Sequence, residues 1–302
     1  MYKIDKQNGN IAFEEERHKY FDITDPNKEF VSVTTLIHKF TQPFDENFWS
    51  AYKALEKLIP TDSWSLEKKS LLNSKKFDKN LLDLYNISEL EFNKIQQGIL
   101  DEWDKNKRIA CERGTKIHLD LENAFYDKPK DISLKKYGIG GKFECKKNYY
   151  DLDLEKGVYP EYLIYWESDD GVLKIAGQVD LIIKDGNTII AVDHKTNRNI
   201  DKNSGFDAKT KSNVKMLYPL NHLPDCNFYH YTLQLSTYAW MLQKLNPDFI
   251  IKDLIINHYD HNNNNVLYHC DYLKKDVEKM LYYFKKDLLI KQQRNKRIKI
   301  EY

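Results

Sequence analysis

Two acidic residues lie where two apolar runs end, and each run is typical of a short buried strand. The first run ends on Asp180, and the second ends on Asp193, with Lys195 two positions later. An Asp-Gly-Asn break between the runs predicts a hairpin, and the alternation of side chains places Asp193 and Lys195 on one face. The two carboxylates, with a nearby backbone carbonyl, would suit Mg²⁺ or Mn²⁺, and Lys195 would hold a water near a phosphate. The alternative is a hairpin whose end charges are only solvated.

Two further pairs of polar residues are spaced four positions apart in stretches that are typical of helices. His118 and Glu122 form one pair, and Gln234 and Tyr238 form the other. Residues at this spacing lie on one helix face, one turn apart. Taken singly, each group could be an ordinary surface or core residue. Together with the two strand ends, they form an ordered set that is hard to obtain by chance.

In this ordered set the chain resembles the RecB-like branch of the PD-(D/E)XK nuclease superfamily. The resemblance covers residues 113–245 and is carried by four motifs: Gly114-x-x-x-His118, Gly177-x-x-Asp180, Asp193-x-Lys195 and Gln234-x-x-x-Tyr238. Within this branch the chain is most similar to phage-encoded and mitochondrial genome-maintenance-type exonucleases, through His18-Lys-Tyr20 and residues 31–37 and 217–231.

The resemblance implies roles for the matched residues. His118, Asp180 and Asp193 would bind the metal, and Lys195 would be the catalytic lysine. Gln234 and Tyr238 would position the scissile DNA strand or the catalytic groups. One or two ions of Mg²⁺ or Mn²⁺ would be the cofactor.

Five more residues are candidates for the same site. Glu161 begins an aromatic and β-branched run that is typical of a strand, and it is either a further metal ligand or a glutamate on a wet face. Thr196 and Arg198 follow the lysine and could contact phosphate, or they could belong to a simple polar loop. Thr115 and Glu122 are expected on the DNA-binding face of their helix.

Composition limits the class of protein. The chain has 302 residues and a formal net charge of only +1, so phosphate contacts must come from local patches. No run approaches the ~20 apolar residues of a membrane span, and residues 1–8 carry no signal core. We therefore expect a cytoplasmic protein without a membrane partner, in the host cytoplasm if phage-encoded. The four cysteines form no Cys-x-x-Cys pair, so neither a zinc site nor a redox motif is expected. Some members of the resembled branch hold an iron–sulfur cluster with one early cysteine and three after the Gln-x-x-x-Tyr helix, but only Cys270 follows that helix here, so no cluster is expected.

The strands and helices that the sequence pattern indicates predict an α/β fold. The resemblance implies that this fold is a restriction-endonuclease-like core with a mixed central sheet flanked by helices. Residues 1–102 would form an N-terminal hairpin and a helical region packed on the core, and residues 103–302 would form the nuclease core with a C-terminal helix. The hairpin would use residues 11–21 and 30–37. Strands are expected at 159–167, 173–183, 188–194, 250–258 and 266–270, and helices at 103–126, 229–245 and 274–292.

The predicted function is a metal-dependent deoxyribonuclease of phage-type DNA metabolism or recombination. We expect an exonuclease that prefers single-stranded DNA ends, because residues 48–100 could roof the site and admit one threaded strand. The polar segment 199–227 would contact the backbone through its lysines, which are Lys202, Lys209, Lys211 and Lys215. An endonuclease, a catalytically silent DNA-binding module and an RNA-directed enzyme remain alternatives. The chain contains no Gly-x-x-x-x-Gly-Lys-Ser/Thr loop, so a helicase or recombination partner would be a separate protein.

Overall fold

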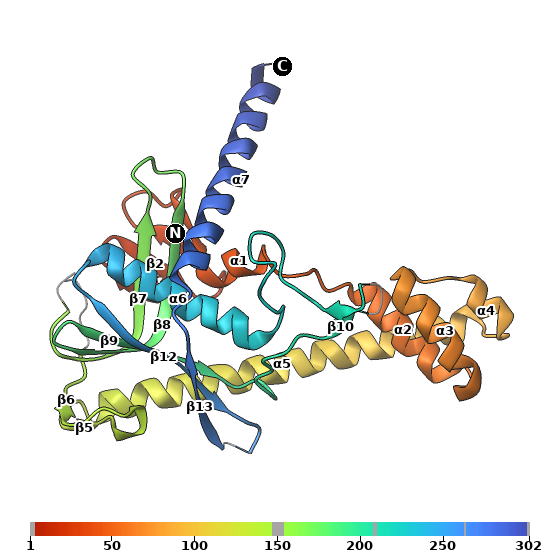
Figure 1. Ribbon diagram of the computed structural model, residues 1–302, viewed down its shortest axis with the longest axis horizontal. Coiled ribbons are helices and arrows are strands. Elements are labelled where there is room, and N and C mark those ends of the chain that lie inside the picture. Colours follow the sequence, from red (N-terminus) through yellow and green to blue (C-terminus); the bar gives the residue numbers. More distant parts are fainter. Residues whose placement is uncertain (1–3, 147–153, 208–209, 263, 301–302) are drawn as a thin grey trace.

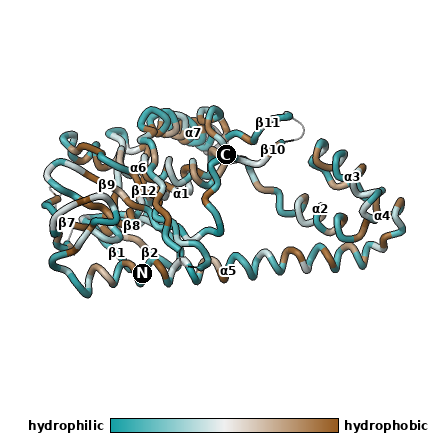
Figure 2. The backbone as a smooth tube through the Cα atoms, turned by 60° about the horizontal axis from the view of Figure 1, so that its bottom comes forward, coloured by the Kyte–Doolittle hydropathy of each residue, from teal (hydrophilic) through white to brown (hydrophobic). Residues whose placement is uncertain are grey.

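The structure is a computed structural model that describes residues 4–146, 154–207, 210–262 and 264–300. Helices flank a large mixed sheet, which confirms the predicted α/β class (Figure 1). A helical arm extends from one side of this core, and both overall views show it apart from the sheet (Figures 1 and 2). No helix within the described ranges is long and apolar enough to cross a membrane.

The central sheet has nine strands in the order β1-β2-β3-β4-β8-β9-β12-β13, with β7 paired to β8. β4 runs parallel to β8 and β9 runs parallel to β12, whereas the other neighbours are antiparallel. The strands are β1 (Lys6–Asn8), β2 (Ile11–Glu14), β3 (Lys19–Asp22), β4 (Glu29–Ser32), β7 (Gly157–Glu167), β8 (Lys174–Asp185), β9 (Thr188–Lys195), β12 (Ile250–Tyr259) and β13 (Asn265–Cys270).

The sheet forks at the middle of β8. One edge of β8 pairs with β7 along its length, but the other edge is shared by two strands. β4 pairs with Ile175 and Ala176, and β9 pairs from Leu181 onward. Residues 177–180 therefore lie in the gap between β4 and β9, where no strand occupies the second edge of β8. This gap is where the side chains of the candidate site gather.

Apolar side chains alternate between the two faces of the sheet, as strand geometry requires. Ile182 and Ala191 pack on the face covered by α1 (Val33–His38), α6 (Asn227–Leu245) and α7 (Lys274–Ile300). Leu181 and Ile190 pack on the opposite face, against residues 132–143 and the end of α5 (Glu89–Asp127). The smaller elements are β5 (Ile132–Ser133), η1 (Lys135–Tyr137), β6 (Lys142–Phe143), β10 (Phe206–Asp207) and β11 (Ser212–Asn213).

Three predicted elements differ from the structure. Residues 11–21 were expected as one arm of a hairpin, but a turn at residues 15–18 divides them into the antiparallel strands β2 and β3. Residues 33–37 were expected to continue a strand, but they form α1, because the Ser32 side chain accepts a hydrogen bond from the Thr35 N–H (3.0 Å) and caps the helix. The helix expected at 103–126 is the second half of the 39-residue α5. The predicted division between residues 102 and 103 falls inside this helix, so no linker marks it.

The helical region packs on the first half of α5. It consists of α2 (Glu46–Leu58), α3 (Thr61–Ser74) and α4 (Asn80–Leu84), and its hydrophobic cluster is separate from those of the sheet. Phe48, Leu55, Trp64 and Phe92 are buried in this cluster. The helical region therefore stabilises itself as an arm at one end of α5, and none of its residues lines the cavity described below.

Candidate functional site

Three carboxylates form a row across β7, β8 and β9. The β7–β8 register places Glu161 opposite Asp180. Continuing the β8–β9 register by one pair places Asp193 opposite Asp180 on its other side. Like charges directly opposite each other destabilise a sheet. A row of this kind therefore requires nearby cations.

Asp180 lies in the fork, where its side chain accepts a hydrogen bond from a backbone N–H of β9 that β8 does not pair with. Its Oδ2 accepts a hydrogen bond from the His194 backbone N–H at 2.5 Å. The side chain of His194 points to the opposite face, where its Nδ1 lies 2.9 Å from Asn257 Nδ2. The backbone of His194 thus braces Asp180, and its buried imidazole contacts the ring of His118 edge-on, with the ring centroids 5.9 Å apart.

His118 reaches this row from α5. Its Nδ1 lies 3.7 Å from Glu161 Oε1 and 3.7 Å from Asp180 Oδ2, and its Nε2 lies 3.0 Å from the His194 carbonyl oxygen. Nε2–H donates to this carbonyl, and loss of the proton on Nδ1 would leave a lone pair that faces the two carboxylates. The ligand atoms of His118, Glu161 and Asp180 all lie within 4.8 Å of one another. This set of one nitrogen and carboxylate oxygens fits a divalent cation such as Mn²⁺ or Mg²⁺.

The pKa values of these groups reflect crowded charge. Burial raises the pKa of the Asp180 carboxyl to about 7, and the neighbouring carboxylates of Asp193 and Glu161 act in the same direction. Burial lowers the pKa of His118, but Asp180 and Glu161 outweigh burial and raise that pKa to about 9. Without a bound cation, His118 is therefore mostly protonated at neutral pH, and Asp180 is about half-protonated. A bound cation would have to displace those protons.

Glu161 is held in an unusual backbone conformation. Its φ is +51°, in the left-handed region that β-strand residues other than glycine seldom adopt. Such a conformation costs roughly 1–3 kcal/mol and persists only where the surroundings enforce it. Here the side chain is fixed on both oxygens. Oε1 faces His118, and Oε2 accepts hydrogen bonds from Gln178 and from Lys6, whose Nζ lies 3.2 Å away.

Asp193 belongs to a second group, next to the cation-binding set. Its Oδ2 lies 2.6 Å from Lys195 Nζ, and its Oδ1 accepts a hydrogen bond of 3.2 Å from Gln234 Nε2. Gln234 Nε2 also lies 3.2 Å from the hydroxyl of Tyr238. Asp193 is only 1% exposed, so its charge depends on Lys195. α6 thereby positions the Asp-x-Lys pair through its Gln-x-x-x-Tyr face.

Gly177 allows this approach of α6 to β8. A methyl group at Gly177 would lie 2.5 Å from Tyr238 Cε1 and 3.0 Å from its hydroxyl oxygen. The first distance is shorter than real contacts and the second is unusually tight, so any larger residue would push Tyr238 away. The displacement would reach Gln234 and then Asp193 through the hydrogen bonds described above.

We predict that Gly177→Ala lowers the free energy of unfolding by about 1–3 kcal/mol, the usual cost of overpacking. Urea denaturation measures this change. Gly98→Ala is the matched control, because a methyl group there meets nothing within 4 Å and lies in the interior of α5. The control should gain up to about 1 kcal/mol from helix propensity. Equal stability of Gly177→Ala and the wild type would mean that Tyr238 is not held against β8.

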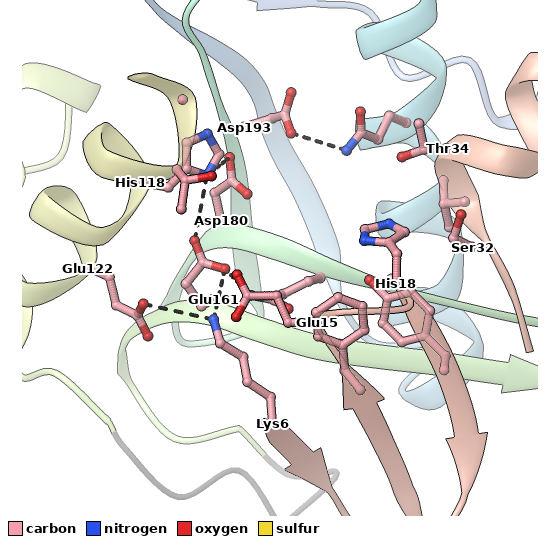
Figure 3. A pocket seen from close by; sticks show the side chains of 18 of the residues that line it. Lys6, Glu15, His18, Ser32, Thr34, His118, Glu122, Glu161, Asp180 and Asp193 are labelled. Atoms are coloured by element: carbon pink, nitrogen blue, oxygen red, sulfur yellow. Dashed lines mark hydrogen bonds and ion pairs between the residues drawn. The ribbon is translucent and has the colours of Figure 1, made fainter. Parts of the chain in front are cut away.

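A cavity of about 530 Å³ joins these groups, and it is shown from close by in Figure 3. Every predicted site residue except Thr196 and Arg198 lines it: Thr115, His118, Glu122, Glu161, Asp180, Asp193, Lys195, Gln234 and Tyr238. The carbonyl of Thr196 instead accepts a hydrogen bond from Arg113, and the side chain of Arg198 is exposed. The described lysines of 199–227 also lie outside the lining, and Lys209 lies outside the described residues.

The wall facing α5 comes from the N-terminal strands and the start of α1, rather than from the helical region that was expected to roof the site. Its lining residues are Asp5, Lys6, Phe13, Glu15, His18, Tyr20, Ser32, Val33 and Thr34. The sequence connected residues 18–20 and 31–37 only with the resemblance to exonucleases and not with the wall of the site. Lys6 was missed, because a single lysine in a polar N-terminus carries no local signal of a site.

We predict that His118 binds a divalent cation directly through Nδ1. In a crystal soaked with Mn²⁺, that nitrogen should lie within about 2.0–2.4 Å of the ion, near the range for nitrogen ligands. The reason is that Nε2 is engaged with the His194 carbonyl, whereas Nδ1 faces two carboxylates. An imidazole turned away from an occupied site would remove His118 from the ligands.

Comparison with known proteins gives only distant likenesses. No family model matches the chain, and no curated protein matches it. The solved structure of SSO0001 aligns over 77% of this chain and 87% of its own, at 16% identity and a TM-score of 0.33. A protein from Eubacterium rectale described as a "putative exonuclease" aligns over 87% of this chain and 81% of its own, at 11% identity and a TM-score of 0.33. Likenesses at this level do not decide a family or an activity, so the functional argument depends on the site itself.

Proposed function

We propose that this chain is a metal-dependent deoxyribonuclease of the RecB-like branch of the PD-(D/E)XK superfamily. The observation that carries the proposal is the row of Glu161, Asp180 and Asp193 at the fork of the sheet, with His118 and Lys195 in the same cavity. A structural hairpin has no need for buried like charges that face one another. A site that binds cations and a phosphodiester needs such a group of carboxylates to hold the cations.

His118, Glu161 and Asp180 would hold the first cation, and Asp193 would contribute on the side of Lys195. When bound, Mg²⁺ or Mn²⁺ would polarise the phosphate and lower the pKa of an attacking water. The ammonium of Lys195, fixed by Asp193 at 2.6 Å, would orient that water or stabilise charge that develops on the phosphate. Gln234 and Tyr238 would keep this pair in position through α6.

The finer proposal is an exonuclease that prefers single-stranded DNA ends and acts in phage-type DNA metabolism or recombination. Support comes from the enclosure of the cavity between α5 and the N-terminal strands, together with the motif resemblance. Thr196 and Arg198, at and just beyond the end of β9, would contact the strand outside the cavity. An endonuclease of the same fold would use the same metal chemistry. It would differ from the proposed exonuclease by cutting covalently closed circular DNA, which has no ends.

The test of the activity is cleavage of labelled DNA with Mg²⁺, with Mn²⁺ or with EDTA. We expect hydrolysis with either ion and none with EDTA, restored by adding back excess metal. Binding of DNA without hydrolysis under every metal condition would instead favour a catalytically silent DNA-binding module. The same assay with labelled RNA separates the two nucleic acids.

A further inference from the structure

The two outer carboxylates of the row each hold a lysine. Lys195 Nζ lies 2.6 Å from Asp193 Oδ2 on one side, and Lys6 Nζ lies 3.2 Å from Glu161 Oε2 on the other. Asp180, between them, contacts His118 and the His194 backbone N–H. Lys195 is part of the Asp-x-Lys motif, whereas Lys6 comes from the first strand of the chain. The two ammonium groups therefore flank the site from opposite ends of the sequence.

Lys6 is held in this position by its strand. Lys6 pairs with Phe13 in the β1–β2 ladder, and the Asn8 side chain donates a 2.7 Å hydrogen bond to the Leu163 carbonyl of β7. Figure 3 shows the side chain rising from β1 between Glu161 and Glu122, whose Oε2 lies 3.8 Å from Nζ. The side chain is one-third exposed. It is therefore anchored at its base and open to the cavity at its tip.

The charge of the cavity makes this ammonium important. Carboxylates outnumber ammonium groups in the lining: Asp5, Glu15, Glu122, Glu161, Asp180 and Asp193 stand against Lys6 and Lys195. A phosphodiester that enters the site meets a negative field, which is partly offset by the metal and by the two lysines. The metal and Lys6 also compete, because both are cations that approach the carboxylate of Glu161.

We infer that Lys6 is a second active-site lysine, which neutralises Glu161 in the empty enzyme and contacts the substrate phosphate once a divalent cation has taken that carboxylate. This inference rests on the proposed function. It implies that the N-terminal strand is part of the active site. It also implies that metal binding releases the ammonium for DNA, so that metal binds before substrate.

Removing the charge of Lys6 should move two measurements in opposite directions. Lys6→Met frees Glu161 and removes a repulsive charge, so Mn²⁺ should bind on the order of tenfold tighter. The same change removes a phosphate contact, so the KM for a single-stranded oligonucleotide should rise on the order of tenfold at saturating Mn²⁺. A purely structural lysine would not produce opposite changes.

The experiment measures Mn²⁺ affinity without DNA, by the electron paramagnetic resonance signal of free Mn²⁺, and then KM and kcat for the oligonucleotide. Lys6→Arg keeps the charge and should resemble the wild type in both. Lys19→Met is the matched control. Lys19 lies in the same set of antiparallel N-terminal strands, β1 to β4, and forms an ion pair of 2.6 Å with Glu29, but it does not line the cavity. It should change neither quantity.

Three results would overturn the inference. Weaker Mn²⁺ binding in Lys6→Met together with a lower melting temperature would make Lys6 a structural residue. Unchanged Mn²⁺ affinity would mean that Lys6 does not compete for Glu161, and unchanged KM would mean that it does not contact the substrate. A wild-type protein that neither binds Mn²⁺ nor cleaves DNA would instead refute the proposed function itself.

Discussion

Alanine at Asp193 or at Lys195 is expected to lower the rate of metal-dependent DNA cleavage at least about a thousandfold. Asp193 contributes charge beside the metal and fixes Lys195, and Lys195 acts on the water or on the phosphate. Because the two residues form one unit, the double variant should be little worse than either single variant. Initial rates on a labelled single-stranded oligonucleotide with Mn²⁺ measure all three.

Folding has to be controlled in this experiment, because the pair is buried. Lys195→Ala leaves the Asp193 carboxylate without its ammonium partner, and breaking a buried ion pair in this way commonly costs about 3–5 kcal/mol. Asp193→Asn retains the shape of the side chain and can still accept from Gln234, so it serves as the milder variant. Asp185→Ala, at the far end of the same hairpin, removes an exposed ion pair with Lys156 and should keep full activity. Undiminished cleavage by Asp193→Ala, with contaminating nuclease excluded, would show that the site is wrongly assigned.

The second large effect is expected from closing the ends of the substrate. Linear single-stranded DNA should be degraded from an end, whereas a covalently closed single-stranded circle of the same sequence should resist. The cavity of about 530 Å³ is comparable to a small-molecule pocket and lies between α5 and the N-terminal strands. We expect it to accept one flexible strand around the scissile phosphate more readily than a duplex.

End-labelled linear and circular substrates, run on denaturing gels over time, distinguish the two modes. The rate of cleavage should fall steeply as the salt concentration rises, because the described loop lysines Lys202, Lys211 and Lys215 would contact the phosphate backbone of the DNA. It should depend little on the DNA sequence, because contacts to phosphate carry no direct sequence information. If the circle were cut as fast as the linear DNA, the result would favour the endonuclease hypothesis.

Local patterns in the sequence were sufficient to predict the central elements. The strands expected at 159–167, 173–183 and 188–194 correspond to β7, β8 and β9, and the helix expected at 229–245 corresponds to α6. Alternating apolar residues determine which face of a strand is buried, and this requires only neighbouring residues in the chain. The pairing of Asp193 with Lys195 on one face, and the opposite direction of His194, follow from the same alternation.

Local patterns did not predict two features of the structure: the helical state of residues 33–37 and the full length of α5. Residues 33–37 alternate like a strand, but the cap provided by Ser32 and packing against α6 make them a helix. Both halves of α5 were predicted as helix, one within the helical region and the other at 103–126, but not as one continuous helix whose first half buries Phe92 and Ile99 against the arm. Residues 33–37 combine a local cap with tertiary packing, and α5 is covered along its first half by the arm.

The sequence by itself determined the chemistry of the site: a histidine, two aspartates and a lysine at motif spacing, on elements whose periodicity is local. Only the tertiary structure decided how these groups are arranged. The pairing of β4 with only the first part of β8 opens the fork in which Asp180 faces the cavity, and the β7–β8 register places Glu161 opposite it. The contact between Lys6 and Glu161 joins residues that are 155 positions apart. Such contacts depend on the closure of long loops and on the packing of whole elements, which leave no signature in neighbouring residues.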